Sequence, residues 1–223
     1  TQLIKPGCPV VYGTFVTSMS MKSGAPTFGT AEAAQAMCIS GALARRLGVP
    51  FRSGGGFTSS KVSDAQAGYE AANTLHATLD AGVNISLHVA GWLEGGLTMG
   101  YEKFVMDADQ AGVLATAARG IDMSENGQAM DAIREVGPQS HFLACKHTEK
   151  NYREAFYMAE LSDSQSFEQW KENGSKDMEM AANIKYKKML SEYELPPLDP
   201  EIDQQLLDYM KKVKDSYPDS NIA

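Results

Sequence analysis

Cysteine is scarce in this chain of 223 residues, and its three cysteines lie far apart. Cys8, Cys38 and Cys145 are odd in number and include no CxxC pair. This spacing supports neither a zinc site nor a framework of disulfides. Unpaired cysteines are typical of proteins in a reducing compartment, so we expect a cytoplasmic protein.

Long apolar runs and an excess of positive charge are also lacking. No apolar run approaches the roughly 20 residues of a membrane span, and no signal peptide is evident. The chain carries 20 Lys and Arg against 28 Asp and Glu, which disfavours a nucleic-acid-binding protein because such proteins are usually basic. Residues 1–60 nevertheless have a net charge of +4, so the remainder carries −12. This first segment either presents a basic surface to an anionic partner or cofactor, or contains buried strands with few acids.

The motifs of several enzyme classes are missing as well. The four histidines form no metal-ligand pattern, and no nucleophile elbow accompanies a Ser/His/Asp order. The run Gly54, Gly55 and Gly56 lacks the Lys-Ser/Thr ending of a P-loop and the acidic residue of a dinucleotide fingerprint. These absences argue against metal-dependent hydrolysis, acyl transfer and nucleotide binding.

What is present is an alternation of short apolar runs and helical patterns. The runs that read as buried strands are residues 9–16, 49–53 and 84–90. Each is followed by a loop rich in Gly or Ser and then by a helical pattern, at about 30–47, 63–82 and 101–119. On the first helix, Met37, Leu43 and Leu47 are expected to face the sheet. Such βα units build a parallel sheet, so we expect three parallel neighbouring strands whose following loops share one rim.

The pattern changes after Gly120, where no further buried strand is evident and helical patterns follow one another. These patterns cover residues 126–136, 148–157, 167–192 and 201–217. We therefore expect an α/β fold in which residues 1–120 form the last βα units of a (β/α)8 TIM barrel. Residues 121–223 would form a helical C-terminal extension that packs on it. Three βα units cannot close a barrel, so we expect either that the missing strands lie upstream in a longer polypeptide or that another chain covers the exposed edge.

The ends of the strands are where a barrel of this kind places its site. His88 lies near the end of the third strand, and Trp92 and Glu94 follow it. An aromatic face and a carboxylate together suit a quaternary ammonium group, which is attracted to ring faces. Tyr12, Phe15 and Phe51 would add walls to this pocket. The alternative is that His88 and the aromatic residues fill the core.

The glycines after the second strand allow two interpretations. Gly54, Gly55 and Gly56 either let a bulky ligand approach the backbone closely or form a flexible turn at the rim.

Four stretches carry a resemblance to a known family and occur in its order. They are YGTFVTSMSMKSGAPTFG at 12–29, SKVSDAQAGYE at 60–70, GWLEGGLTMGYEKFVM at 91–106 and LPPLDPEI at 195–202. The chain thereby resembles the C-terminal part of the trimethylamine methyltransferase family, whose members are longer at the N-terminus.

The resemblance implies an enzyme that moves a methyl group from a methylated amine to the cobalt of a corrinoid carried by a partner protein. It implies that the loops with Ser18, Gly54, Gly55, Gly56 and Lys61 face this corrinoid protein, and that no metal is bound by the chain itself. The Asp-x-His-x-x-Gly signature of a corrinoid carrier is absent from the chain.

Some members of the family carry pyrrolysine, and others lack it and use quaternary amines such as betaines. Only ordinary residues appear in this sequence, so we expect a non-pyrrolysine member with a quaternary amine substrate. Lys61 is the position to check for an unusual residue. A non-catalytic barrel module that binds quaternary amines or docks a corrinoid carrier is the alternative function.

Overall fold

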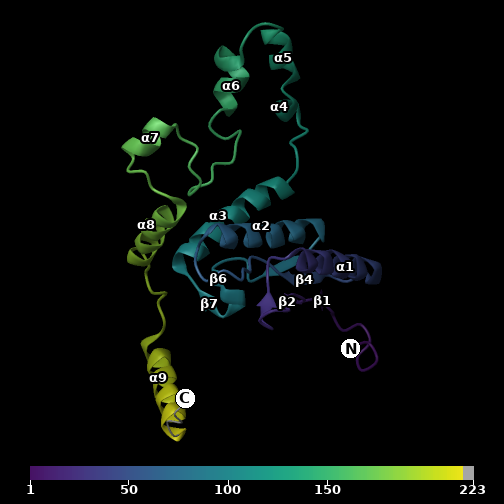
Figure 1. The fold of residues 1–223 in the computed structure, drawn as a ribbon, viewed down its shortest axis with the longest axis vertical. Helices are drawn as coiled ribbons and strands as arrows, with labels where there is room; N and C mark the ends of the chain where they lie inside the picture. Colours follow the sequence, from purple (N-terminus) through teal and green to yellow (C-terminus); the bar gives the residue numbers. More distant parts are fainter. Residues whose placement is uncertain (218–223) are drawn as a thin grey trace. The chain divides into compact units, whose positions relative to one another are not determined.

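The computed structural model describes residues 1–217 and contains short strands among many helices (Figure 1). The chain divides into two compact units, of which the first is Thr1–Lys187 and the second begins at Lys188. All strands of the described residues lie in the first unit.

The central sheet consists of β1 (Tyr12–Gly13), β4 (Phe51–Gly54) and β5 (Ile85–Leu87), in the order β1-β4-β5. Tyr12 pairs with Phe51 and Arg52 pairs with Ile85, and both pairings are parallel. The expectation of three parallel neighbouring strands is therefore confirmed. The strands are shorter than the sequence predicts, and β5 ends at Leu87 because His88 adopts a left-handed backbone with φ 56°.

Three long helices follow the three strands in turn: α1 (Ala31–Leu47), α2 (Ala65–Asp80) and α3 (Tyr101–Ala118). Gly48 ends α1 with φ 65°, the left-handed conformation that glycine adopts without steric cost. Asp64 begins α2, where its carboxylate accepts a hydrogen bond from the Ala67 amide at 3.0 Å. Figure 1 shows α1 and α2 beside β4.

Small side chains line the contact between the sheet and the helices. Phe51 is the largest residue there, and it packs with Met37, Ala44, Ala77 and Ala81.

The expectation for the leucines of α1 was partly wrong. Met37 is buried as expected, but Leu43 and Leu47 are exposed. Gly41 and Ala44 occupy the buried face instead. Gly41 comes so close to α2 that a Cβ atom there would overlap the carbonyl oxygen of Ala81. Close approach of the two helices therefore selects small residues over leucines.

Two hairpins lie within the loops that follow β1 and β5. The first pairs β2 (Ser18–Met19) with β3 (Pro26–Thr27), and the second pairs β6 (Trp92–Leu93) with β7 (Thr98–Met99) around the 3-10 helix η1 (Glu94–Gly96).

Helices make up the regular structure after α3 as far as Tyr217. They are α4 (Glu125–Gln128), α5 (Met130–Val136), η2 (Phe142–Ala144), α6 (Lys146–Asn151), α7 (Phe167–Glu172), α8 (Met178–Ser191) and α9 (Pro200–Ser216). The single helix expected at 167–192 is wrong, because Gly174 and Ser175 adopt left-handed conformations between α7 and α8. The helix expected at 201–217 is confirmed as α9, with Asp199 as its N-cap.

The segment from Glu160 to Lys187 packs against α3. Leu161 and Ala182 form a buried cluster with Val105. The Asp109 carboxylate accepts hydrogen bonds from the amides of Glu160 and Leu161, at 2.8 and 3.3 Å. None of the helices within residues 1–217 is long and apolar enough to cross a membrane.

We predict opposite effects for alanine at two helical glycines. Gly41→Ala should lower the free energy of unfolding by roughly 1–3 kcal/mol, because the added methyl group meets the backbone of Ala81. Gly68→Ala in α2 should raise it by roughly 0.5–1 kcal/mol, because nothing lies within 4 Å of the new Cβ atom. Urea unfolding of the two variants measures both changes, and a stabilised Gly41→Ala variant would contradict the close contact.

Candidate functional site

The loops that follow β1, β4 and β5 meet at the carboxyl ends of the strands. The Phe28 amide donates to the Ser59 hydroxyl at 3.0 Å, which joins the first loop to the second. The Gly95 amide donates to the Thr58 carbonyl at 2.7 Å, and the Glu94 amide donates to the Ser60 carbonyl at 2.7 Å. These bonds confirm the expectation that the three loops share one rim.

Five rings gather at this rim, and we call them the aromatic cluster: Phe15, Phe28, Phe57, His88 and Trp92. The centroids of contacting rings lie 4.9–5.8 Å apart, within the range of favourable aromatic pairs. The structure therefore brings together Phe15, His88 and Trp92, which the sequence singled out. Phe28 and Phe57 were missed, although both stand in the rim loops where barrel sites form.

His88 contacts three other rings of the cluster, those of Phe15, Phe57 and Trp92. Its position after the end of β5 means that strand alternation does not set its direction. The Nδ1 atom is buried and has no hydrogen-bond partner among residues 1–217. A left-handed backbone is costly for a non-glycine residue and tends to persist at functional sites.

The structure places two predicted wall residues elsewhere. Phe51 is only 1% exposed and packs between the sheet and the helices α1 and α2. Tyr12 lies beside it, with ring centroids 6.2 Å apart. Because Tyr12 and Phe51 are register partners in a parallel pair, their side chains share that helix-covered face. The structure thus places Phe51 in the core and the partly buried Tyr12 against it, apart from the aromatic cluster.

The space beside Gly54, Gly55 and Gly56 is filled by other residues of the chain. A Cβ atom at Gly56 would overlap the carbonyl oxygen of Val89, and one at Gly55 would lie 2.9 Å from the Ser86 hydroxyl. A Cβ atom at Gly54 would lie 3.3 Å from the Phe15 ring. Gly55 and Gly56 are buried under the segment after β5, so they do not offer an open surface to a corrinoid protein.

The remaining predicted site residues lie on the rim itself. Glu94 is exposed in η1 and has a left-handed backbone with φ 50°. Lys61 is exposed, and its ammonium group donates to the Ser59 carbonyl at 2.7 Å. The Ser18 hydroxyl lies 2.6 Å from the Thr27 hydroxyl and 3.1 Å from the Thr30 hydroxyl.

The Glu70 carboxylate of α2 anchors the loop between β4 and α2. Its Oε2 atom accepts hydrogen bonds from the Thr58 hydroxyl and the Ser59 amide, both at 2.6 Å. Sequence reasoning did not assign this role to Glu70, although the residue ends the stretch SKVSDAQAGYE.

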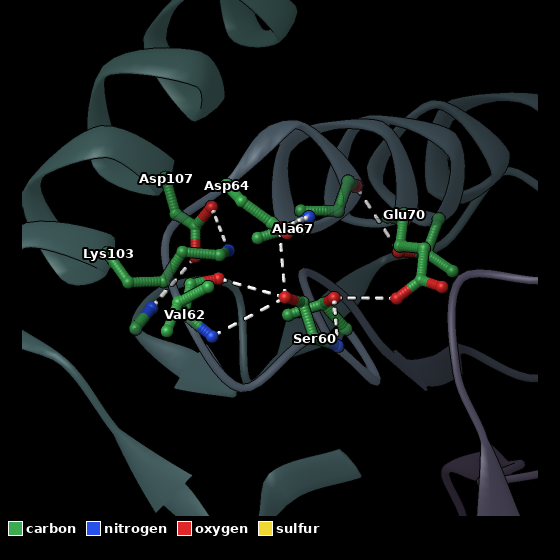
Figure 2. A network of polar contacts seen from close by, with 11 residues as sticks. Ser60, Val62, Asp64, Ala67, Glu70, Lys103 and Asp107 are labelled. Carbon is green, nitrogen blue, oxygen red and sulfur yellow. Dashed lines mark hydrogen bonds and ion pairs between the residues drawn. The ribbon is translucent and has the colours of Figure 1, made fainter. Parts of the chain in front are cut away.

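The carboxylate of Asp64, the N-cap residue of α2, closes the same loop, as Figure 2 shows. The Ser60 hydroxyl donates to Asp64 Oδ1 at 2.8 Å. The amide of Ala67 and then the hydroxyl of Ser60 lower the pKa of the Asp64 carboxyl, because both bonds favour its charged form.

A small cavity of about 30 Å³ lies under the rings of Phe15, Phe28 and Phe57. It has room for about one water molecule. Phe15 is 51% exposed, so a ligand can reach the aromatic cluster from the solvent-exposed side of the Phe15 ring. Within residues 1–217, no group of three or more His, Cys, Asp or Glu side chains is arranged to hold a metal ion.

We predict that Glu70→Ala loosens the rim. The buried Thr58 hydroxyl and the Ser59 amide would lose their acceptor, so the free energy of unfolding should fall by roughly 1–3 kcal/mol. The near-ultraviolet circular dichroism of the aromatic cluster should weaken as well. Gln66→Ala is the control, since it removes only the exposed contact to Glu70 Oε1. Equal effects of the two variants would refute this role of Glu70.

Comparison with known proteins assigns the chain to a family. The family model described as trimethylamine methyltransferase (MTTB) matches residues 1–218. Glycine betaine methyltransferase of Desulfitobacterium hafniense (strain Y51) is 44% identical over 205 residues, which are 92% of this chain and 43% of that protein. Trimethylamine methyltransferase MttB2 of Methanosarcina mazei is 33% identical over 203 residues, which are 90% of this chain and 40% of that protein. The chain thus spans about two fifths of the length of these relatives, and it belongs to the trimethylamine methyltransferase family.

Proposed function

We propose that this chain is part of a methyltransferase that moves a methyl group from a quaternary amine to the cobalt of a corrinoid protein. The observation that carries the proposal is the aromatic cluster at the shared rim, on a chain that belongs to the methyltransferase family. We place this activity in the complete polypeptide to which the chain contributes.

The aromatic cluster suits the part of the substrate that lacks hydrogen-bond donors. A trimethylammonium group is held best by ring faces, and each such contact contributes about 0.5–2 kcal/mol. Several rings must therefore converge, as Phe15, His88 and Trp92 do. Since the cavity beneath the rings has room for about one water, the ammonium group would rest on the outer side of Phe15 and Trp92. Glu94 would add negative charge at longer range.

The proposed methyl transfer requires the substrate to be positioned and does not require acid catalysis. The corrinoid of the partner protein would supply the nucleophile that takes the methyl group, and the nitrogen would keep the electron pair of the broken C–N bond as an uncharged tertiary amine. A quaternary ammonium group needs no proton to leave, so the rim residues orient the methyl group and exclude water around it. Ser18 and Lys61 would face the corrinoid protein, whereas the buried Gly55 and Gly56 would support the loop from below.

The names of the relatives support a substrate class. The chain is 44% identical to a protein named for glycine betaine and 31–33% identical to proteins named for trimethylamine. We infer a betaine-like quaternary amine and a site without pyrrolysine. Mass spectrometry of the peptide that contains Lys61 tests whether that residue is an ordinary lysine.

We also propose that β1, β4 and β5 are three of the eight strands of a TIM barrel. Residues 1–120 would be its last βα units, and 121–223 would be the helical extension. The other strands would come from further residues of the same polypeptide or from another copy of the chain. We expect this assembly in the cytoplasm.

The reaction is tested on the chain within its natural polypeptide. The protein is incubated with cob(I)alamin and a panel of glycine betaine, other quaternary amines, trimethylamine and dimethylamine, and cobalamin methylation is followed by absorbance. Methylation with quaternary amines alone is expected. Methylation only with trimethylamine would refute the substrate class. Binding of quaternary amines without methylation would identify a non-catalytic module instead.

We predict that Trp92→Leu lowers kcat/KM for the quaternary amine about two- to thirtyfold, because one ring contact of about 0.5–2 kcal/mol is lost. His88→Ala should also lower kcat/KM for the quaternary amine, while the fold stays intact. Tyr69→Leu is the matched control, since this ring is exposed on α2 outside the aromatic cluster. Unchanged kinetics in Trp92→Leu and His88→Ala would leave the aromatic cluster as core packing.

A further inference from the structure

We propose that Asp107, neutralised by Lys103, is a positioning residue that fixes the turn carrying His88 and Trp92. The inference rests on the proposed function in one respect, because it treats the aromatic cluster as the substrate site. It adds two residues of α3 that belong neither to the aromatic cluster nor to the rim loop held by Glu70.

Asp107 and Lys103 form a buried ion pair on successive turns of α3. The ammonium group lies 2.5 Å from both carboxylate oxygens, and Lys103 is 1% exposed. Figure 2 shows the two side chains directed at each other. Oδ2 of Asp107 also accepts a hydrogen bond from the Gly91 amide at 2.9 Å. The pair is thereby tied to the backbone between His88 and Trp92.

The turn that receives this bond has an unusual backbone. His88 has φ 56° and Gly91 has φ 89°, so two of its residues are left-handed. The carbonyl of His88 accepts from the Gly56 amide at 3.0 Å, and the carbonyl of Gly91 accepts from the Gly100 amide at 3.0 Å. A left-handed histidine needs such external contacts to persist. The Asp107 bond is the only one of these three in which a side chain is the acceptor.

Stability alone does not account for a buried ion pair at this place. Replacing such a pair with apolar residues of similar volume is often neutral or stabilising, because two charges no longer have to be desolvated. Burial raises the pKa of the Asp107 carboxyl, and the Lys103 ammonium opposes that rise. Lys103 thus favours the carboxylate form that accepts from Gly91.

The chain offers a matched comparison on the same helix. Asp109 lies two residues further along α3, and its carboxylate accepts from the amides of Glu160 and Leu161. It therefore anchors backbone in the same chemical way as Asp107, but to a segment that holds no ring of the aromatic cluster. A general loss of anchoring would affect both sites, whereas a positioning role would affect only Asp107.

In the experiment, the fluorescence of Trp92 reports how the turn positions this residue. Trp92 and Trp170 are the two tryptophans among these 223 residues, so Trp170→Phe leaves Trp92 as their single fluorescent indole, and any tryptophan in the rest of the natural polypeptide is likewise replaced by Phe. In this background, the double variant Lys103→Met with Asp107→Leu, called the Asp107→Leu pair, removes the acceptor but keeps the volume of the two side chains and their summed charge of zero. The double variant Lys103→Met with Asp107→Asn, called the Asp107→Asn pair, restores an acceptor for the Gly91 amide. Asp109→Leu is the control.

Two measurements are made on each full-chain variant: the emission and acrylamide quenching of Trp92, and the dissociation constant for tetramethylammonium. The Asp107→Leu pair should fold, show Trp92 emission at longer wavelength with stronger quenching, and bind about tenfold more weakly, as expected for the loss of one charge-assisted hydrogen bond. The Asp107→Asn pair should return both readouts most of the way to those of the parent. Asp109→Leu should match the parent in both.

Three outcomes would overturn the positioning role. The Asp107→Leu pair could leave Trp92 unchanged, the Asp107→Asn pair could fail to restore it, or Asp109→Leu could shift Trp92 as strongly. A failure of the proposed function looks different, because tetramethylammonium would then bind to no variant, the parent included. The Trp92 emission would still decide the role of Asp107 in that case.

Discussion

The hydrogen bonds of the Glu70 carboxylate hold the loop on which the whole rim rests. Thr58 and Ser59 are bound directly by this group. Ser59 in turn receives the amide of Phe28, and Thr58 receives the amide of Gly95. One rim loop is therefore bound directly by the Glu70 carboxylate of α2, and the other two are hydrogen-bonded to residues that Glu70 binds. Polar contacts thus join the loops that carry the rings.

The order of strands and helices could be predicted from the sequence because it depends on local patterns. Apolar runs and helical periodicity are properties of a few neighbouring residues, and they identified β1, β4 and β5 and their parallel pairing. The shared rim followed from that topology. Membership in the family was visible for a similar reason, since three of the four motifs lie in the rim loops and the helices that follow them, and the fourth lies at the start of α9.

The direction of individual side chains could not be predicted in the same way. Phe51 and His88 both belong to strands in the sequence pattern, yet Phe51 faces the helices and His88 adopts a left-handed backbone just after the strand. These directions depend on where a strand ends and on contacts with distant residues such as Asp107. Leu43 and Gly41 show the same limit on a helix, where the closeness of a neighbour outweighs hydrophobicity.

The contact between α1 and α2 also constrains how this sequence can change over time. Apart from Met37 and Leu75, the buried positions of the two helices hold small residues, and Gly41 already lies against the carbonyl oxygen of Ala81. Substitutions there can move only among the smallest amino acids, whereas the exposed Leu43 and Leu47 are free to become polar. A survey of tolerated substitutions in α1 should therefore find Gly41 and Ala44 constrained and Leu43 and Leu47 variable, although leucines are usually the more constrained residues of a helix.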